Sequence, residues 1–305
     1  MNPIKFRVIA SGALVKQEQV MAAAEVLRGL GHVVSLGEHV FASYRYLAGT
    51  IAQRAADLQA ALADPEVDAI WIARGGFGSA QLMAGLDALP VAKPIIGYSD
   101  NCVILHEFAR RNGVAIHGPC FERIGATEPD KKRLDDIHEV LSLIDHLRCG
   151  HKNQRLARQF AGHQVAGPVV DELHGKVTGG NLATIVSVMG SPWELDCEDK
   201  ILLLEDVGEA YYRIERMLLQ LQLAGKLQGL VAVGLGEFSN CPRRDVAHSI
   251  EQIFAEYLTP LGIPLFAGLP FGHGQVNRPW ILHETGVLTP AGLSLQPPLA
   301  ECDDE

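Results

Sequence analysis

The first half of the chain alternates short apolar runs with longer helical patterns, and this alternation constrains the fold more than any other feature. Strands are expected over 6–10, 32–36, 67–73, 93–97 and 114–117, and helices over 17–30, 48–62 and 102–110. Strands that alternate with helices in this way form a parallel sheet with helices on both faces. In such sheets the ligand site lies in the loops beyond the carboxyl ends of the strands.

The pattern changes after a charged helix expected over 130–143. The following stretch is polar, rich in His and Arg, and without clean periodicity, so we predict a linker over 146–165. A second alternation of strands and helices begins near Gly179. We therefore predict an α/β protein. Residues 1–145 form an N-terminal domain with a mostly parallel sheet flanked by helices, and residues 166–305 form a smaller, strand-rich α/β domain.

Composition excludes several classes of protein. The 305 residues include 26 Lys and Arg against 36 Asp and Glu, and a formal net charge of −10 repels nucleic acid. No apolar stretch approaches the ~18 residues of a membrane helix, so no membrane partner is expected. The six cysteines are widely spaced and lack zinc-ligand patterns, so we expect reduced thiols, no metal and a cytoplasmic location. The apolar run 8–10 is broken by Ser11 and Gly12, which favours a first strand over a signal peptide.

Two loops that follow predicted strands carry residues suited to chemistry. The glycine-rich loop 73–79, which contains Arg74, fits a tight turn, an oxyanion hole or a phosphate cradle, and the residues do not decide among the three. The second loop places Ser99 between a strand and a helix, as in a nucleophile elbow, with Asn101 in place of the last glycine. Ser99 and Asp100 are also good helix N-cap residues, and the residues alone favour that simpler explanation.

A serine nucleophile needs a base, and the base needs an acid to orient it. Glu205 ends an apolar strand, and His273 lies in the glycine-flanked turn 270–274. A carboxylate at a strand end and an exposed loop histidine are equally ordinary explanations for these two residues. Four other histidines compete for the role of base: His106, His117, His174 and His283.

Six motifs, taken in order along nearly the whole chain, resemble the LD-carboxypeptidase family of serine peptidases. This family contains the muramoyl-tetrapeptide carboxypeptidases and the related microcin C self-immunity hydrolases. The motifs are Arg74-Gly75-Gly76-Phe77-Gly78-Ser79, Gly97-Tyr98-Ser99-Asp100, His117-Gly118-Pro119, Gly179-Gly180-Asn181-Leu182, Leu204-Glu205-Asp206 with Tyr212-Arg213-Ile214-Glu215-Arg216, and Pro270-Phe271-Gly272-His273.

The resemblance implies a catalytic triad of Ser99 as nucleophile, His273 as general base and Glu205 as the residue that orients the histidine. It implies an oxyanion hole formed by the backbone N–H groups of Gly76 and Asp100. The serine would come from the first domain and the other two residues from the second, so the site is expected between the domains. Arg74 either binds the carboxylate of the substrate or braces the glycine loop.

The activity that the resemblance implies is release of terminal D-alanine from a murein tetrapeptide during peptidoglycan recycling, by cleavage of an L,D peptide bond. No metal or organic cofactor is implied. The partners expected are the murein peptide and a second copy of the chain in a homodimer, although burial within the domain is expected for the apolar stretch 217–223. Two alternatives stay open: an amidase that cleaves nucleotide–peptide conjugates, as the microcin immunity enzymes do, and a non-catalytic two-lobed ligand-binding protein.

Overall fold

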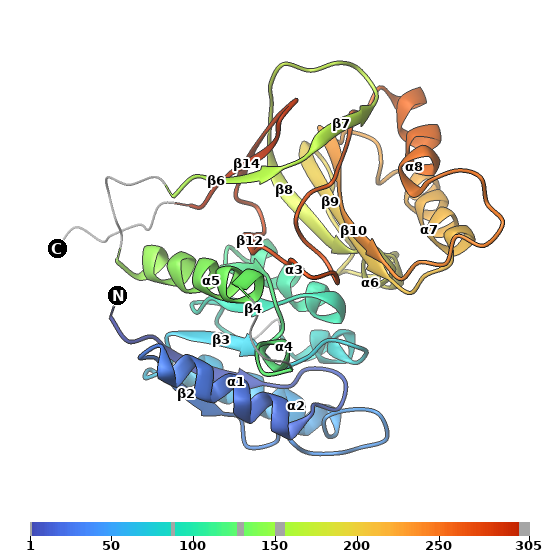
Figure 1. Ribbon diagram of the computed structural model, residues 1–305. Helices are drawn as coiled ribbons and strands as arrows, with labels where there is room; N and C mark the ends of the chain where they lie inside the picture. Colours follow the sequence, from blue (N-terminus) through green and yellow to red (C-terminus); the bar gives the residue numbers. More distant parts are fainter. Residues whose placement is uncertain (1, 87–88, 127–130, 150–155, 299–305) are drawn as a thin grey trace. The chain divides into compact units, whose positions relative to one another are not determined.

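The computed structural model describes residues 2–86, 89–126, 131–149 and 156–298. The described residues form two compact units, unit 1 within Met1–His151 and unit 2 within Lys152–Leu299 (Figure 1). Each unit is built around its own sheet. The expected mixed α/β fold is confirmed in both units.

The sheet of unit 1 is parallel and follows the order β5-β4-β3-β1-β2. Its central strands β3 and β4 are buried along their whole length, as expected of a parallel sheet covered on both faces. The strands are β1 (Lys5–Ile9), β2 (Val33–Leu36), β3 (Ala69–Ile72), β4 (Ile95–Gly97) and β5 (Ala115–His117).

Helices cover the sheet of unit 1 on both sides (Figure 1). The second helix begins at a capping box, in which the side chains of Thr50 and Gln53 each accept from the backbone of the other residue, and it ends before Asp64 and Pro65. The helices are α1 (Gln17–Gly29), α2 (Ile51–Ala63), α3 (Cys102–Arg110), α4 (Phe121–Ile124) and α5 (Lys131–Cys149), with the 3₁₀ turns η1 (Ser79–Gly85) and η2 (Ser99–Asn101).

Unit 2 contains a mixed sheet of eight strands in the order β6-β14-β13-β8-β9-β10-β11-β7. The central strands β8 to β11 are parallel, and the flanking strands pair antiparallel. The strands are β6 (Arg158–Ala161), β7 (His163–Ala166), β8 (Leu173–Asn181), β9 (Lys200–Val207), β10 (Ala232–Ser239), β11 (Leu265–Ala267), β13 (Thr285–Thr289) and β14 (Gly292–Gln296); a further short strand, β12, is Trp280–Ile281.

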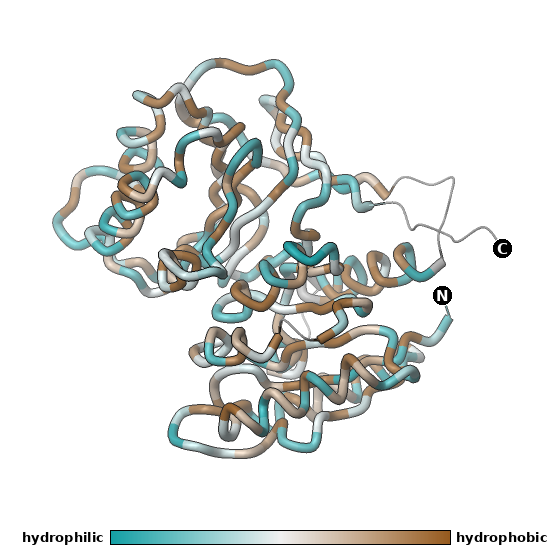
Figure 2. Tube along the Cα trace, turned by 180° about the vertical axis from the view of Figure 1, so that it is seen from behind, coloured by the Kyte–Doolittle hydropathy of each residue, from teal (hydrophilic) through white to brown (hydrophobic). Residues whose placement is uncertain are grey.

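Three helices pack against the sheet of unit 2: α6 (Leu182–Ser187), α7 (Tyr211–Leu223) and α8 (Ile250–Leu258), the last followed by the 3₁₀ turn η3 (Thr259–Leu261). Hydrophobic and hydrophilic stretches alternate along these helices (Figure 2). Leu218, Leu221 and Phe254 are fully buried in one hydrophobic cluster with the residues of β9 and β10. This cluster is the core that fixes the positions of the strand ends in unit 2.

Regular structure occupies most of the range expected as a linker. Helix α5 continues to Cys149, and β6 and β7 lie within 158–166. Strand β8 was also not expected, because its three glycines give it a weak strand pattern. Gly179 explains the discrepancy: a Cβ at this position would lie 1.9 Å from the carbonyl oxygen of Leu203, so β8 approaches β9 more closely than any side chain permits. Tertiary packing, rather than intrinsic propensity, forms this strand.

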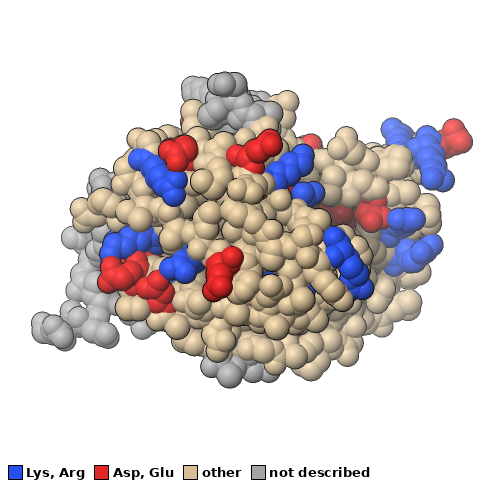
Figure 3. All heavy atoms as spheres, turned by 90° about the horizontal axis from the view of Figure 1, so that it is seen from below, with Lys and Arg blue, Asp and Glu red and all other residues tan. Residues whose placement is uncertain are grey.

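No helix in the described part of the chain is both long and apolar enough to cross a membrane. The described residues likewise contain no group of three or more His, Cys, Asp or Glu side chains that could hold a metal ion. On the face that Figure 3 shows, basic and acidic side chains are interspersed and form no continuous basic patch.

Candidate active site

The backbone at Ser99 has the conformation of a strained strand-to-helix turn. Strand β4 ends at Gly97, Tyr98 is extended, and Ser99 has a φ of 64° before η2 leads into α3. A left-handed conformation costs a residue other than glycine roughly 1–2 kcal/mol. Such strain is typical of a nucleophile elbow, which presents the serine hydroxyl at the edge of the sheet.

Helix capping does not explain Ser99 and Asp100. The N-cap residue of α3 is Asn101, and no side chain makes a capping hydrogen bond there. The carboxylate of Asp100 instead accepts a hydrogen bond from the backbone N–H of Ser79 at 2.8 Å, and so joins the serine turn to the glycine loop. Burial raises the pKa of Asp100 against the opposing effect of this hydrogen bond.

Asn101 anchors the same turn from within the unit. Its Oδ1 accepts hydrogen bonds from the hydroxyls of Ser11 at 2.7 Å and Ser79 at 3.1 Å, all in buried positions. Sequence reasoning missed this function of Ser11 and Ser79. The available signal was that Ser11 follows β1, so it lies at the same sheet edge as the loop after β4.

The glycine loop lies directly against the serine turn. A Cβ at Gly75 would lie 2.8 Å from the Cβ of Ser99, 3.1 Å from its Oγ and 3.2 Å from the backbone nitrogen of Asp100. A Cβ at the next residue, Gly76, would lie 2.6 Å from the Cβ of Ala13. Unit 1 therefore brings together the loop around Gly76 with Ser99 and Asp100, and Gly75 is the residue that permits the approach.

Arg74 braces the glycine loop. Its Nε lies 3.3 Å from the Oε1 of Glu122, and its Nη1 donates to the carbonyl oxygen of Leu14 at 3.1 Å. The other carboxylate oxygen of Glu122 accepts from the backbone of Lys16 at 3.2 Å. The side chain of Arg74 is nevertheless 42% exposed. Arg74 can therefore hold the glycine loop and still contact a ligand.

In unit 2, Glu205 and His273 form a hydrogen-bonded pair. The Oε2 of Glu205 lies 2.6 Å from the Nδ1 of His273, and the carboxylate is fully buried while the imidazole is 14% exposed. The Oε1 of Glu205 is buried without a hydrogen-bond partner within the described part of the chain. A buried carboxylate in this position holds the imidazole orientation and stabilises the imidazolium when it forms.

The turn that carries His273 is held by backbone contacts. The N–H of Gly272 donates to the Oδ1 of Asn277 at 3.0 Å, and the N–H of Glu237 in β10 donates to the carbonyl oxygen of Phe271 at 2.9 Å. Gly272 has a φ of 126°, and a Cβ there would lie 3.2 Å from the Oε2 of Glu205. The turn thus requires a small residue before the histidine. Sequence reasoning missed Asn277, since nothing local marks it.

Asp206 points to the opposite face of β9 and fixes the start of α6. Its carboxylate accepts hydrogen bonds from the backbone of Val207 at 2.7 Å and of Ala183 at 2.9 Å, and from the Nδ2 of Asn181 at 3.2 Å. Asn181 in turn caps α6 by accepting from the backbone N–H of Thr184 at 3.0 Å. Burial is the largest effect on the pKa of Asp206 and raises it to about 6.

Family models match most of the chain. Residues 6–118 match the N-terminal domain of the LD-carboxypeptidases, and residues 174–288 match the C-terminal domain. The murein tetrapeptide carboxypeptidase of Pseudomonas aeruginosa is 39% identical over 94% of this chain and 94% of its own length.

Solved structures share the fold. A muramoyltetrapeptide carboxypeptidase from Oxalobacter formigenes superimposes with a TM-score of 0.82 at 25% identity, covering 96% of this chain and 98% of that one. The microcin C7 self immunity protein MccF superimposes with a TM-score of 0.85 at 19% identity, covering 99% of this chain and 98% of its own. The resemblance expected from the sequence motifs is confirmed, and the chain belongs to the LD-carboxypeptidase family of serine peptidases.

Proposed function

We propose that this protein is a serine carboxypeptidase that releases the terminal D-alanine of a murein tetrapeptide by hydrolysing an L,D peptide bond. The 39% identity to the murein tetrapeptide carboxypeptidase of Pseudomonas aeruginosa over 94% of both chains carries this proposal. The strained backbone of Ser99 and the pairing of the buried Glu205 with the partly exposed His273 support the chemistry. Ser99, His273 and Glu205 are the proposed catalytic triad.

The first half of the reaction forms an acyl-enzyme. His273 accepts the proton of the Ser99 hydroxyl through the ring nitrogen that does not face Glu205, and Ser99 Oγ attacks the carbonyl carbon before D-alanine. The carbonyl oxygen becomes an oxyanion, which we place against the backbone N–H groups of Gly76 and Asp100. The C–N bond then breaks, and the proton on His273 passes to the amine of the departing D-alanine.

Water completes the reaction. His273 accepts a proton from water, the hydroxide attacks the acyl carbon, and the C–O bond to Ser99 breaks as the proton returns to the serine. Throughout the cycle Glu205 holds the imidazole and balances its positive charge. Removal of one oxyanion donor typically costs ~2.7–4 kcal/mol of transition-state stabilisation. This exceeds the free energy of the strained backbone at Ser99.

A carboxypeptidase also recognises the free carboxylate of its substrate. Arg74 is the proposed partner, because its side chain is 42% exposed beside the glycine loop while its contacts to Glu122 and Leu14 hold it in place. A planar guanidinium matches a carboxylate with two parallel hydrogen bonds.

The replacement Ser99→Ala tests the assignment. We expect D-alanine release to fall by roughly 10⁴-fold or more while folding is preserved, since the triad loses its nucleophile. Ser142→Ala, in α5, is the matched control and keeps full activity. Retained turnover by purified Ser99→Ala would exclude the triad.

The choice of substrate also separates the competing functions. Parallel assays with a murein tetrapeptide and an aminoacyl nucleotide conjugate distinguish the carboxypeptidase from an amidase of the microcin immunity type, whose fold this chain shares. Binding of either compound without turnover by the wild-type protein would favour the non-catalytic alternative.

We further propose a homodimer in the cytoplasm. Leu219 and Leu223 of α7 are 40% and 79% exposed, although Leu218 and Leu221 on the same helix are buried, so part of the expected apolar stretch is available to a second copy. Sedimentation velocity measures the mass directly. Cys120 and Cys197 are buried and form no disulfide with another described residue, as suits a reducing compartment.

A further inference from the structure

A tight hairpin next to the glycine loop presents two exposed aromatic rings. The backbone N–H of Tyr44 donates to the carbonyl oxygen of Leu47 at 2.9 Å, and the N–H of Leu47 donates to the carbonyl oxygen of Tyr44 at 3.0 Å. Arg45, at the tip, has a φ of 58°. Tyr44 is 47% exposed and Tyr46 is 56% exposed. Neither the fold nor the proposed triad explains why a strained tip should carry the sequence Tyr-Arg-Tyr.

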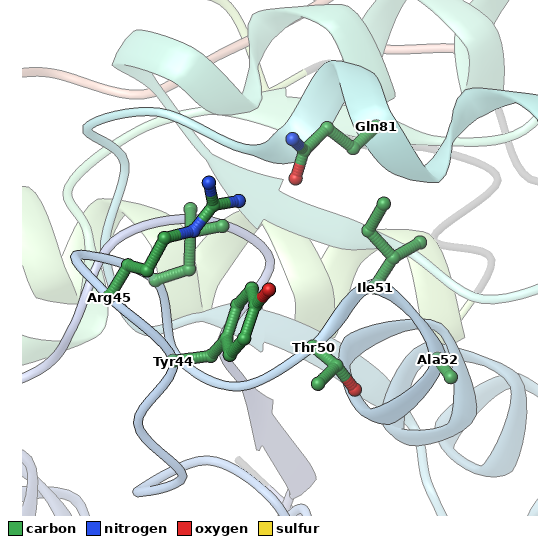
Figure 4. A pocket seen from close by; sticks show the side chains of 7 residues that line it. Tyr44, Arg45, Thr50, Ile51, Ala52 and Gln81 are labelled. Atoms are coloured by element: carbon green, nitrogen blue, oxygen red, sulfur yellow. The ribbon is translucent and has the colours of Figure 1, made fainter.

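The hairpin forms one wall of a pocket in unit 1, and the start of α2 forms another (Figure 4). Its volume of ≈ 320 Å³ is within the range of small-molecule sites. The lining residues are Tyr44, Arg45, Leu47, Thr50, Ile51, Ala52 and Gln81. The lining therefore combines apolar and aromatic surface with a single charged group, and that group is a cation.

The electrostatics of this hairpin pocket favour an anion. The guanidinium carbon of Arg45 lies 4.9 Å from the centre of the Tyr44 ring and 5.5 Å from that of Tyr46. No carboxylate of the described residues forms an ion pair with Arg45. The first turn of α2 also carries no acidic residue, so the positive end of that helix adds to the field.

The hairpin contacts the same glycine loop that contacts the serine turn. The Tyr46 ring packs on Phe77 of the glycine loop at 6.0 Å, and the carbonyl oxygen of Tyr46 accepts from the N–H of Leu14 at 3.1 Å. A Cβ at Gly78 would lie 2.8 Å from the Cδ2 of Leu47. The same loop reaches Ser99 at Gly75, and Phe77 between these two contacts is exposed.

We propose that the hairpin pocket is a subsite for the non-reacting part of the peptide substrate, and that Arg45 binds a carboxylate carried there. This proposal rests on the proposed carboxypeptidase function. The guanidinium stacked on two tyrosine rings has its orientation restricted and its edge available for a bidentate contact with a planar carboxylate. Leu47, Ile51 and the Tyr44 ring cover the aliphatic chain that bears this group.

A pair of peptides tests the subsite. Both end in the same scissile bond to D-alanine, and they differ only in a carboxylate or a carboxamide on a residue upstream of that bond. We expect wild-type kcat/KM to favour the carboxylate peptide by about tenfold or more, as is typical of one hydrogen bond to a charged group. In Arg45→Gln this preference disappears, and the loss is in KM with kcat retained. An unchanged preference in Arg45→Gln would overturn the proposal.

Further experiments distinguish the subsite from the proposed carboxypeptidase reaction on which it rests, and from an interface between two copies of the chain. Arg28→Gln removes an exposed charge from α1, away from the pocket lining, and keeps the preference. Dissociation constants of both peptides in a Ser99→Ala background do not depend on turnover, so they report on the subsite even if the proposed reaction is wrong.

A change of mass by sedimentation in Arg45→Gln, with the preference intact, would assign the hairpin to an interface between copies. Selective binding of inorganic phosphate over acetate, lost in Arg45→Gln, would assign the pocket to a phosphorylated ligand and equally overturn the proposal.

Discussion

At the scale of single residues, the serine turn depends on the absence of one side chain. Gly75 is buried, and its α-carbon faces Ser99 so closely that an added methyl group would meet both the Cβ and the Oγ of the serine. The sequence motif contains three glycines with no indication of which one faces Ser99. Only Gly75 makes this contact; Gly76 lies against Ala13 and Gly78 against Leu47.

We predict that Gly75→Ala displaces the serine and lowers kcat by roughly 10²-fold, the typical cost of a misplacement of about 1 Å. Crowding at this buried position also lowers the free energy of unfolding by ~1–3 kcal/mol. Steady-state kinetics and urea denaturation measure the two effects. Gly29→Ala in α1 is the control: no atom lies within 4 Å of its Cβ position, so activity is retained and stability rises by up to ~1 kcal/mol. Normal kcat in Gly75→Ala would show that the turn tolerates the methyl group.

At the scale of secondary-structure elements, β9 serves two purposes because successive side chains of a strand point to opposite faces. Glu205 faces the turn of His273, whereas Asp206 faces the start of α6. The two carboxylates are both buried, and the proximity of Glu205 contributes to the raised pKa of Asp206. One short strand thus orients a histidine and anchors a helix.

This arrangement predicts a specific pH dependence of stability. The pKa of Asp206 is about 6 in the folded protein, against ~3.9 for an unfolded aspartate, so the folded state binds the proton more tightly between these values. The free energy of unfolding contributed by this group therefore falls as pH rises from about 4 to about 6. We expect urea denaturation to show this fall in the wild type and not in Asp206→Asn, whose side chain does not titrate. Parallel pH curves for the two proteins would contradict the prediction.

At the scale of the whole molecule, the proposed triad draws on both units, since Ser99 belongs to unit 1 and His273 and Glu205 belong to unit 2. We predict that Ser99→Ala and His273→Ala each lower kcat by ~10⁴-fold or more, and that the double variant is no worse than the poorer single variant. When two residues act in the same step, the loss of kcat in the double variant is no larger than in the poorer single variant. When they act independently, the two fold-losses multiply. The double variant Ser142→Ala with His273→Ala provides the baseline, at the rate of His273→Ala alone. Multiplicative losses would separate Ser99 from His273.

The expected helices and strands agree best with the observed ones where contiguous residues show a clear helical or strand periodicity. Helix α3 spans 102–110 as expected, and every strand expected in unit 1 is present. Disagreement begins at β6 and β7, where the linker is expected, and continues at β8, which follows it; these polar and glycine-rich strands are held by their neighbours in the sheet. Strand propensity is a weak guide there, because pairing with β14, β11 and β9 decides the outcome for β6, β7 and β8.

By itself, the amino-acid sequence determined the alternation of strands and helices, the family, and the motifs in which Ser99, Glu205 and His273 lie, because these depend on periodicity and on short contiguous motifs. Only the tertiary structure decided that Asp206 anchors the start of α6, that Ser11 and Ser79 hold Asn101, and that Tyr44 and Arg45 form a pocket with α2. Each of these contacts joins residues that lie far apart or belong to different elements. Their formation depends on how the sheet packs, which no local pattern records.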